Sequence, residues 1–401
     1  MSAAEPSDLR GAVDLAGDGF DRITAHIHEF HRAIADLPWR AVAALPASGL
    51  ARRLHDGITD GVYAAVRITG AAAFGAARAV LRRIEMPAAA PPVARDVIAG
   101  ALAGFVGDHA LRRRNPLMPR LGFYRDGQRL ALDRASLARA FPQASSRLVV
   151  FVHGLACTEH GWRLYADPAQ PQTRPYGDRL ADDLGYTPLY VRYNTGLHIS
   201  SNGRRLAAAL AQLVDAWPVR VETLALVGHS MGGLVIRAAA AHAHAKGHVW
   251  TTRLRYLVCL GSPHRGAPLE RTVDGLTQVL MPFALSRPWA RLLQARAVGI
   301  RDLKYGATSD ADWRDGPTRR WRPARPVARV PQVRYCFIGS SLGASTDTWF
   351  AQTLGDGLVP TPSSLAAELA DAETVSLCGL HHMQLLNHPA VYAHLRRILG
   401  G

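Results

Sequence analysis

Residues 224–233, with the sequence LALVGHSMGG, decide how this chain folds. An apolar run typical of a strand ends in the pattern G-x-S-x-G, and the residues that follow, 234–241 (LVIRAAAA), are typical of a helix. So sharp a turn from strand to helix forces Ser230 into a strained backbone conformation that exposes its hydroxyl. Side chains at Gly228 and Gly232 would collide across the turn, so both positions need glycine. The pattern therefore predicts a nucleophilic serine at the end of a strand.

Apolar strands alternate with helices on both sides of this turn. The expected strands are 147–153, 188–193, 223–228, 254–260, 333–338 and 374–378. The expected helices are 203–216, 231–245 and 389–399, and an Asp-Gly turn predicts a hairpin at 122–132. Strands that are apolar throughout and separated by helices indicate an α/β fold, with a mostly parallel sheet covered by helices on both faces.

The first 115 residues are rich in Ala, Gly and Arg and predict a separate helical region of unknown role. Three helices are expected there, over 20–37, 49–84 and 93–114, each stopped by a following proline. The small residues of the second helix suit close helix packing, and packing within the protein is favoured over packing at a membrane surface. Residues 116–401 are then expected to form the α/β domain. The stretch 267–331 interrupts the alternation of strands and helices in this domain and predicts a cap or lid.

The chain carries a formal net charge of +15, and only Lys246 and Lys304 of its 47 basic residues are lysines. Such a charge favours anionic partners such as lipid headgroups or acidic substrates. Nucleic acid is not expected, because no zinc-finger, basic-zipper or aromatic RNA-binding pattern accompanies the charge. The four cysteines are isolated, which suits a reducing compartment.

The start of the chain has no signal-peptide pattern, and no apolar run is long enough to span a bilayer. A cytoplasmic location is therefore expected, with peripheral contact to an anionic membrane surface left open. The oligomeric state is also left open.

A serine hydroxyl is a weak nucleophile unless a neighbouring base takes its proton and a carboxylate orients that base. In parallel sheets of this type the acid and then the histidine follow the serine along the chain. Asp356, in GDGLVP at 355–360, is the candidate acid because its flanking glycines let the backbone turn sharply toward an imidazole. Asp347 and Asp371 are the alternative acids.

Two histidines follow the last expected strand directly, in CGLHHMQLLNHP at 378–389. His382 is the predicted base because the apolar residues after it can anchor the loop. His381 is the alternative base, and His388 is interpreted as the start of the last helix.

An oxyanion hole needs two N–H donors. The residue after the serine, Met231, supplies one, and the loop after an early strand supplies the other. Leu155 is the candidate for the second donor because it follows the apolar run 149–152 and the turn residue Gly154. His153 is interpreted as a structural residue that holds this loop by hydrogen bonds.

At this point the chain resembles the α/β-hydrolase superfamily, and within it the lipase-like and GPI-inositol-deacylase-like serine esterases. The matching motifs, spread over about residues 122–400, are HGL at 153–155, GHSMGG at 228–233, GSPHRG at 261–266, GDGLV at 355–359 and HMQLL at 382–386. The resemblance implies hydrolysis of an ester through an acyl-enzyme, without a required cofactor. It places no metal in this chain.

The favoured interpretation is a carboxylic-ester hydrolase acting on lipid-like or other small-molecule acyl esters. An acyltransferase or polyester depolymerase with the same three residues is an alternative, because water and alcohols compete for one acyl-enzyme. The alternative from another class is a non-catalytic protein that binds a membrane or partner on a hydrolase scaffold.

Overall fold

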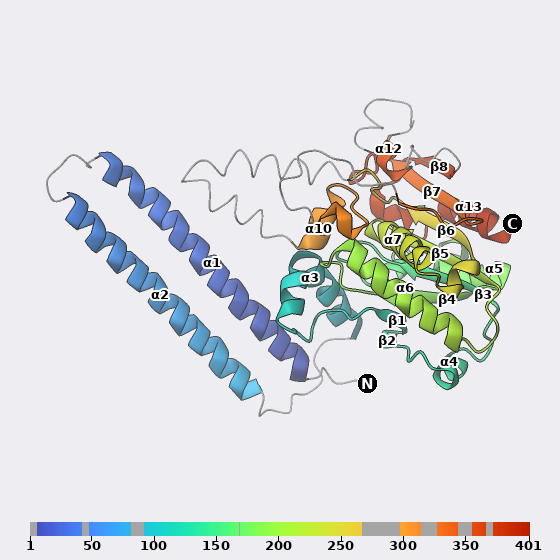
Figure 1. Cartoon of the computed structure of the whole chain (residues 1–401), viewed down its shortest axis with the longest axis horizontal. Helices are drawn as coiled ribbons and strands as arrows, with labels where there is room; N and C mark the ends of the chain where they lie inside the picture. Colours follow the sequence, from blue (N-terminus) through green and yellow to red (C-terminus); the bar gives the residue numbers. More distant parts are fainter. Residues whose placement is uncertain are drawn as a thin grey trace. The chain divides into compact units, whose positions relative to one another are not determined.

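The structure is a computed structural model that describes residues 6–41, 48–81, 92–167, 169–266, 297–313, 327–343, 355–365 and 372–401. Its centre is an eight-stranded sheet with the strand order β2-β1-β4-β3-β5-β6-β7-β8 (Figure 1). The strands are β1 (Gly122–Arg125), β2 (Gln128–Arg129), β3 (Arg147–Val152), β4 (Thr187–Arg192), β5 (Thr223–His229), β6 (Leu254–Leu260), β7 (Arg334–Ser341) and β8 (Glu373–Cys378).

All neighbouring strands from β4 to β8 in this order are parallel, and only β1 runs antiparallel, to both β2 and β4. The mostly parallel sheet predicted from the sequence is therefore confirmed. The hairpin predicted at 122–132 is formed by β1 and β2.

Helices cover both faces of the sheet (Figure 1). They are α4 (Arg134–Ala140), α5 (Tyr176–Leu184), α6 (Ile199–Ala216), α7 (Met231–Ala245), α10 (Val298–Leu303), α12 (Thr361–Ser364) and α13 (Pro389–Gly400). Short 3-10 turns lie at Glu159–Arg163, Pro171–Thr173, Val249–Thr252, Asp310–Asp312 and His382–Leu385.

Successive residues of a strand point to opposite faces, and this divides the core in two. Val150 and Leu226 belong to the cluster that includes Leu210 of α6 and Leu234 of α7. Val149, Phe151 and Val227 belong to the second cluster, with Leu180 of α5 and the α13 residues Val391, Leu395 and Ile398. Burial on both faces explains why these strands are apolar throughout rather than alternating.

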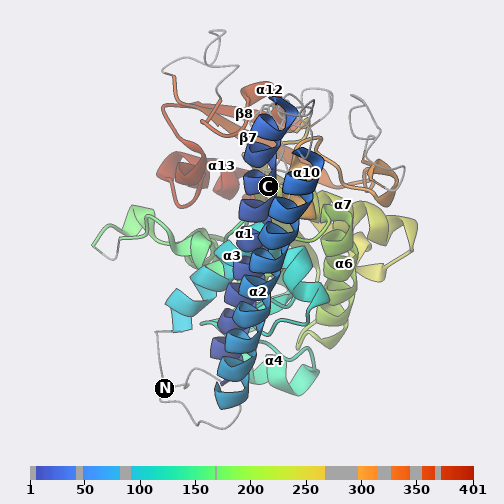
Figure 2. The same ribbon diagram turned by 90° about the vertical axis from the view of Figure 1, so that its left-hand side faces the viewer.

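The N-terminal residues form two long helices, α1 (Pro6–Ala41) and α2 (Ser48–Leu81), which lie side by side in both views (Figures 1 and 2). Phe20 contacts Phe74 across the pair, with ring centroids 5.9 Å apart. A Cβ on Gly70 would lie 2.1 Å from the Phe20 ring, so glycine is required for this close approach. Arg67 also pairs with Asp21 at 2.6 Å.

The predicted limits of the first helix, 20–37, are too short at both ends. The helix begins at Pro6, in the first turn, where the missing N–H has no partner to lose, and it continues past Pro38 to Ala41. Gly11 lies inside the helix. It packs closely against Asn115, because a Cβ at this position would lie 2.7 Å from Asn115 Oδ1.

The third helix, α3 (Pro92–Arg112), contributes to both compact units of the chain. Residues 93–109 form one compact unit with the sheet, whereas α1 and α2 belong to another. The physical reason is that α3 buries Asp96 and a row of small residues against loops of the sheet. Among the described residues, no helix is long and apolar enough to cross a membrane.

Most of the predicted cap, 267–331, falls outside the described residues, at 267–296 and 314–326. The described part includes α10, which packs on the loop after β4. There the Gly299 N–H donates to the Gly196 carbonyl at 3.1 Å, and the Ile199 N–H donates to Asp302 at 2.8 Å.

Candidate active site

Ser230 lies at the turn between β5 and α7 and has a φ of 54° and a ψ of −123°. This conformation is unfavourable for a residue with a side chain and persists only where the surroundings enforce it. A Cβ on Gly228 would lie 2.5 Å from the carbonyl carbon of Gly232, and a Cβ on Gly232 would lie 2.1 Å from the Val152 carbonyl oxygen. Both glycines therefore allow the close approach that the turn needs.

His382 and Asp356 form a buried pair beside this turn. His382 Nδ1 lies 2.7 Å from Asp356 Oδ2, and the two residues are 4% and 1% exposed. The other carboxylate oxygen, Oδ1, accepts the backbone N–H groups of Leu358 and Val359 at 3.0 and 2.9 Å. Since the carboxylate accepts, His382 carries its proton on Nδ1, which leaves Nε2 free to receive one.

The backbone reinforces the pair. The His382 N–H donates to the Asp356 carbonyl oxygen at 3.0 Å. Gly261, which follows β6, has a φ of 58°, and a Cβ on it would lie 3.1 Å from His382 Cε1 and 3.2 Å from Asp356 Oδ2. The end of β6 therefore closes one side of the pair.

His229 connects the serine to the histidine loop. Its ring lies 4.8 Å from the His382 ring, centroid to centroid, and its Nε2 donates to the His382 carbonyl oxygen at 3.2 Å. The Ser230 N–H donates to the Leu260 carbonyl at 2.8 Å. No hydrogen bond joins the Ser230 hydroxyl to His382 among the described residues; such bonds are often long without substrate and shorten when it binds.

The alternative base, His381, has a different setting. It is exposed, and its ring lies edge-on to Tyr165 with centroids 6.2 Å apart. The structure thus brings His382, and not His381, to Asp356. The alternative acids Asp347 and Asp371 lie outside the described residues.

The two candidate oxyanion donors, Leu155 and Met231, come from separate segments near Ser230. Met231 is the first residue of α7, where backbone N–H groups lack partners within the helix. Leu155 follows Gly154, whose Cβ would lie 3.0 Å from the Ser230 Cβ. Among the backbone hydrogen bonds of described residues outside helices and strands, none uses the Leu155 or Met231 N–H.

His153 holds the Leu155 loop. Its Nδ1 donates to the Gly154 carbonyl at 2.9 Å, and the Tyr193 hydroxyl donates to the His153 carbonyl at 2.8 Å. Burial lowers the pKa of His153 to about 4 and that of His229 to about 3. Both imidazoles are therefore neutral at pH 7, as these hydrogen bonds require.

Sequence reasoning did not identify the roles of His229 and of a buried ion cluster built on Asp96. His229 occupies the variable position of G-x-S-x-G, which gives no chemical signal of its own. Asp96 lies 96 positions from its arginine partner, and no local pattern links the two.

One protein family matches part of the chain. Residues 142–313, just under half of the chain, match the family described as "Putative serine esterase (DUF676)". No curated protein sequence matches the chain.

Solved structures with some similarity to the chain include three hydrolase-related or uncharacterised proteins. The gene lin2722 product of Listeria innocua is 15% identical, with a TM-score of 0.37, over 64% of this chain and 94% of that one. A lipase-esterase related protein from Clostridium acetobutylicum is 12% identical, with a TM-score of 0.37, over 63% and 95% of the two chains. The NocB thioesterase domain is 16% identical, with a TM-score of 0.36, over 65% and 96%.

The strand order, the strained turn at Ser230 and the family match together identify an ester-hydrolysing enzyme with the α/β-hydrolase fold. The fold and enzyme class predicted from the sequence are confirmed.

Proposed function

We propose that the protein hydrolyses carboxylic esters through an acyl-enzyme on Ser230, with His382 as general base and Asp356 as its orienting acid. The observation that carries this proposal is the buried 2.7 Å contact between His382 Nδ1 and Asp356 Oδ2, in a loop tied to the residue before Ser230. A carboxylate in that position holds the imidazole in the tautomer that accepts a proton on Nε2 and stabilises the imidazolium that forms.

The reaction follows from these positions. Ser230 Oγ attacks the ester carbonyl carbon while its proton passes to His382 Nε2. The carbonyl oxygen becomes an oxyanion, which accepts hydrogen bonds from the Leu155 and Met231 N–H groups. The intermediate collapses, the alcohol leaves with the proton from His382, and an acyl group remains on Ser230. Water then attacks the acyl-enzyme, again with His382 as base, and releases the acid.

A lipid-like acyl ester is the proposed substrate class. Large apolar side chains remain exposed in the loops that carry the pair and beside them: Leu342 is 51% exposed, Leu358 47% and Tyr165 52%. Leu342 lies against Gly357, next to Asp356, and Tyr165 lies against His381, next to His382. An acyl chain that lies over Leu342, Leu358 and Tyr165 covers apolar surface that water otherwise contacts, and this favours binding of the acyl chain. The apolar residues of 267–296 lie outside the described residues.

A fluorophosphonate probe tests the mechanism, because it forms a stable adduct with an activated serine. Mass spectrometry is expected to locate the adduct on Ser230, and Ser230→Ala should remove both the label and the esterase activity. A wild-type protein that hydrolyses esters without labelling at Ser230 would overturn the proposed nucleophile.

A series of p-nitrophenyl esters of rising acyl length tests the substrate class. We expect kcat/KM to rise from acetate to medium-length acyl chains. Activity that is greatest on acetate and absent on octanoate would refute the lipid-like preference while leaving the mechanism intact.

A further inference from the structure

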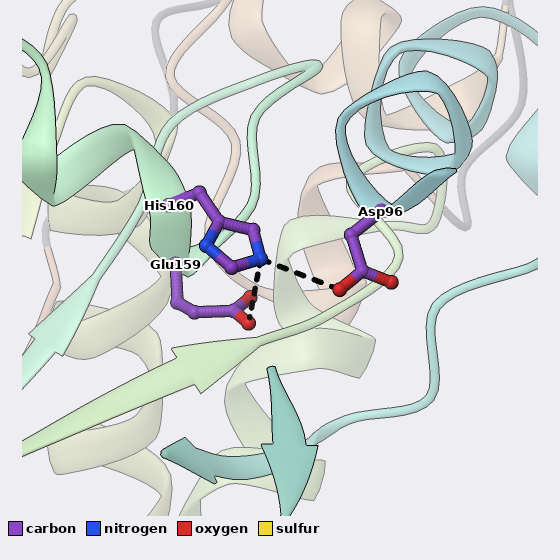
Figure 3. Close-up of side chains that lie close together, drawn as sticks. All are labelled: Asp96, Glu159 and His160. Carbon is purple, nitrogen blue, oxygen red and sulfur yellow. Dashed lines mark hydrogen bonds and ion pairs between the residues drawn. The ribbon is translucent and has the colours of Figure 1, made fainter. Parts of the chain in front are cut away.

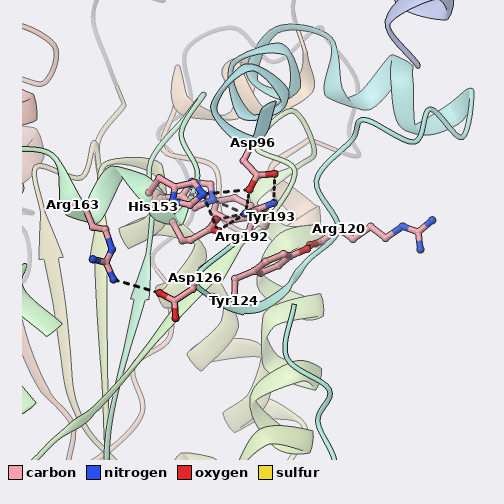
Figure 4. Close-up of polar contacts among 10 residues, drawn as sticks. Asp96, Arg120, Tyr124, Asp126, His153, Arg163, Arg192 and Tyr193 are labelled. Carbon is pink, nitrogen blue, oxygen red and sulfur yellow. Dashed lines mark hydrogen bonds and ion pairs between the residues drawn. The ribbon is translucent and has the colours of Figure 1, made fainter. Parts of the chain in front are cut away.

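Arg192, the last residue of β4, is clamped between two carboxylates from different parts of the chain (Figure 4). Its Nη1 donates to Asp96 Oδ1 of α3 at 2.7 Å, and its Nε donates to Glu159 Oε2 at 2.7 Å. Its Nη2 donates to both carboxylates as well. The guanidinium lies over the Tyr124 ring, 4.2 Å from the ring centroid. All three charged residues are buried, at 7–8% exposure.

The cluster also contains the only group of potential metal ligands found among the described residues, Asp96, Glu159 and His160 (Figure 3). His160 Nε2 lies 3.3 Å from Asp96 Oδ2 and 3.6 Å from Glu159 Oε1. A metal ion fits this donor set poorly, because every carboxylate oxygen already accepts from the Arg192 guanidinium, which also carries the compensating positive charge.

The pKa shifts in this cluster favour the charged forms of Asp96 and Arg192. Burial alone would raise the pKa of Asp96, but hydrogen bonds from His160 and Arg192 outweigh it and lower that pKa. Burial likewise works against the charge of Arg192, and its contacts with Glu159 and Asp96 raise its pKa nonetheless. Removal of one carboxylate would leave a buried charge without its partner, so the three groups depend on one another.

The loop that precedes Glu159 is the loop of the Leu155 oxyanion donor. Helix α3 lies directly against it: a Cβ on Gly104 would lie 2.8 Å from the Ala156 Cβ, and a Cβ on Gly100 would lie 2.8 Å from the Cys157 carbonyl oxygen. Ala156 has a φ of 58°, a strained value for a residue with a side chain. Its N–H donates to Thr195 Oγ1 at 3.2 Å, in the loop that follows Arg192.

The clamp, formed by Arg192, Asp96 and Glu159, therefore joins three segments around this loop. Asp96 fixes α3, Arg192 fixes the end of β4, and Glu159 fixes the far end of the loop itself. A second connection lies further along α3, where Asn194 Nδ2 donates to the Gly107 carbonyl at 2.9 Å. Strain at Ala156 persists only while these surroundings enforce it.

We propose that Arg192, with Asp96 and Glu159, is a positioning residue that keeps the Leu155 N–H aimed at the oxyanion by pressing α3 onto the 154–158 loop. The inference rests on the proposed function and deepens it, because it assigns to α3 a part in the same site. Loss of the clamp should leave Ser230, His382 and Asp356 in place and weaken only transition-state stabilisation.

The test compares Asp96→Asn with Asp183→Asn in the full chain. Asp183 is an exposed control on another helix, where it accepts from the Tyr392 hydroxyl of α13 at 2.8 Å and pairs with Arg396 at 3.3 Å. The concentration of competent sites is measured by complete labelling of Ser230 with a fluorophosphonate, and kcat is expressed per labelled site. We expect Asp96→Asn to lower kcat per site by about 10- to 100-fold, with KM within about twofold of wild type. Asp183→Asn should keep the wild-type kcat per site.

A merely structural role gives another result, in which the number of labelled sites falls but kcat per labelled site stays at the wild-type value; this outcome overturns the proposal. If Asp96→Asn yields no folded protein, Gly104→Ala replaces it, because it keeps all charges and presses on Ala156. Gly104→Ala should then lower kcat per site in the same way, and a wild-type value would overturn the proposal. Failure of wild-type labelling at Ser230 would instead refute the proposed function.

Discussion

His229 donates a hydrogen bond from Nε2 to the backbone carbonyl oxygen of His382, at 3.2 Å. A carbonyl can only accept, so His229 must carry its proton on Nε2. Burial, followed by repulsion from His382, lowers the pKa of His229 to about 3, which keeps the ring neutral. The residue next to the proposed nucleophile thus holds the backbone of the proposed base.

His229→Leu should lower kcat about tenfold. The variant leaves the buried His382 carbonyl without its donor, which costs about 1–3 kcal/mol and loosens the loop of the base. Steady-state kinetics and urea unfolding measure the two effects. His244→Leu, an exposed histidine on α7, is the control and should change neither. Wild-type turnover in His229→Leu would show that the contact does not align the site.

His382→Ala should lower kcat by at least about 10³-fold, because it removes the group that takes the Ser230 proton in the proposed mechanism. His381→Ala should stay within about threefold of wild type, since the structure pairs Asp356 with His382 only. Kinetics on one p-nitrophenyl ester, with circular dichroism as a check on folding, decide the matter. The reverse result would reassign the base to His381.

Asp356→Asn should lower kcat by about 10⁴-fold while the protein remains folded. An amide nitrogen that faces His382 Nδ1 would donate to it, and the proton would move to Nε2, the atom that must accept from Ser230. Kinetics at several pH values measure the loss. A decrease of only a few-fold would move the role of the acid to Asp347 or Asp371.

The sequence predicted the sheet well because its signals are local. Five of the six strands expected from apolar runs end within a residue or so of their observed limits; β7 continues to Ser341, three residues beyond the expected end at 338. Gly228 and Gly232 reveal the turn at Ser230 because steric exclusion permits little else there. Chain order, the glycines beside Asp356 and the apolar residues after His382 then favoured these two residues, and the structure brings this acid and this histidine together.

The supporting contacts could not be predicted, because they join residues far apart in the sequence. Asp96 looks like one more acid in an Ala- and Gly-rich helix, and only the fold shows that it meets Arg192. The contact partners of the glycines in α3 are equally hidden in the sequence. Small residues indicate close packing but do not indicate against what, so the contact of α3 with the 154–158 loop could not be predicted.

Gly261→Ala should reduce both stability and activity. Its φ of 58° costs a side chain about 1–2 kcal/mol, and the new Cβ would also lie 2.7 Å from Leu385 Cδ1 and 3.1 Å from His382 Cε1. Gly185→Ala is a matched control, since its φ is 68° and nothing lies within 4 Å of its Cβ position. Both variants should lose similar backbone stability, but only Gly261→Ala should lower kcat. Equal kcat in the two variants would contradict contact between Gly261 and the base.

Acid should destabilise the protein through its buried neutral histidines. Burial lowers the pKa of His153 to about 4, whereas an unfolded histidine titrates near about 6.5. Between these values the unfolded chain binds more protons than the folded one, so stability rises with pH. The contribution is constant above about pH 6.5, and below it falls by up to about 1.4 kcal/mol per pH unit for each such histidine.

His153→Gln isolates one of these contributions. At about pH 7.5 the variant should be less stable than wild type, because it disturbs the hydrogen bonds to Gly154 and Tyr193. Glutamine does not titrate, so the deficit should shrink as the pH falls toward about 5, where wild type pays for its neutral imidazole. Urea unfolding across this range measures the difference. A deficit that does not change with pH would mean that His153 is not held neutral by the fold.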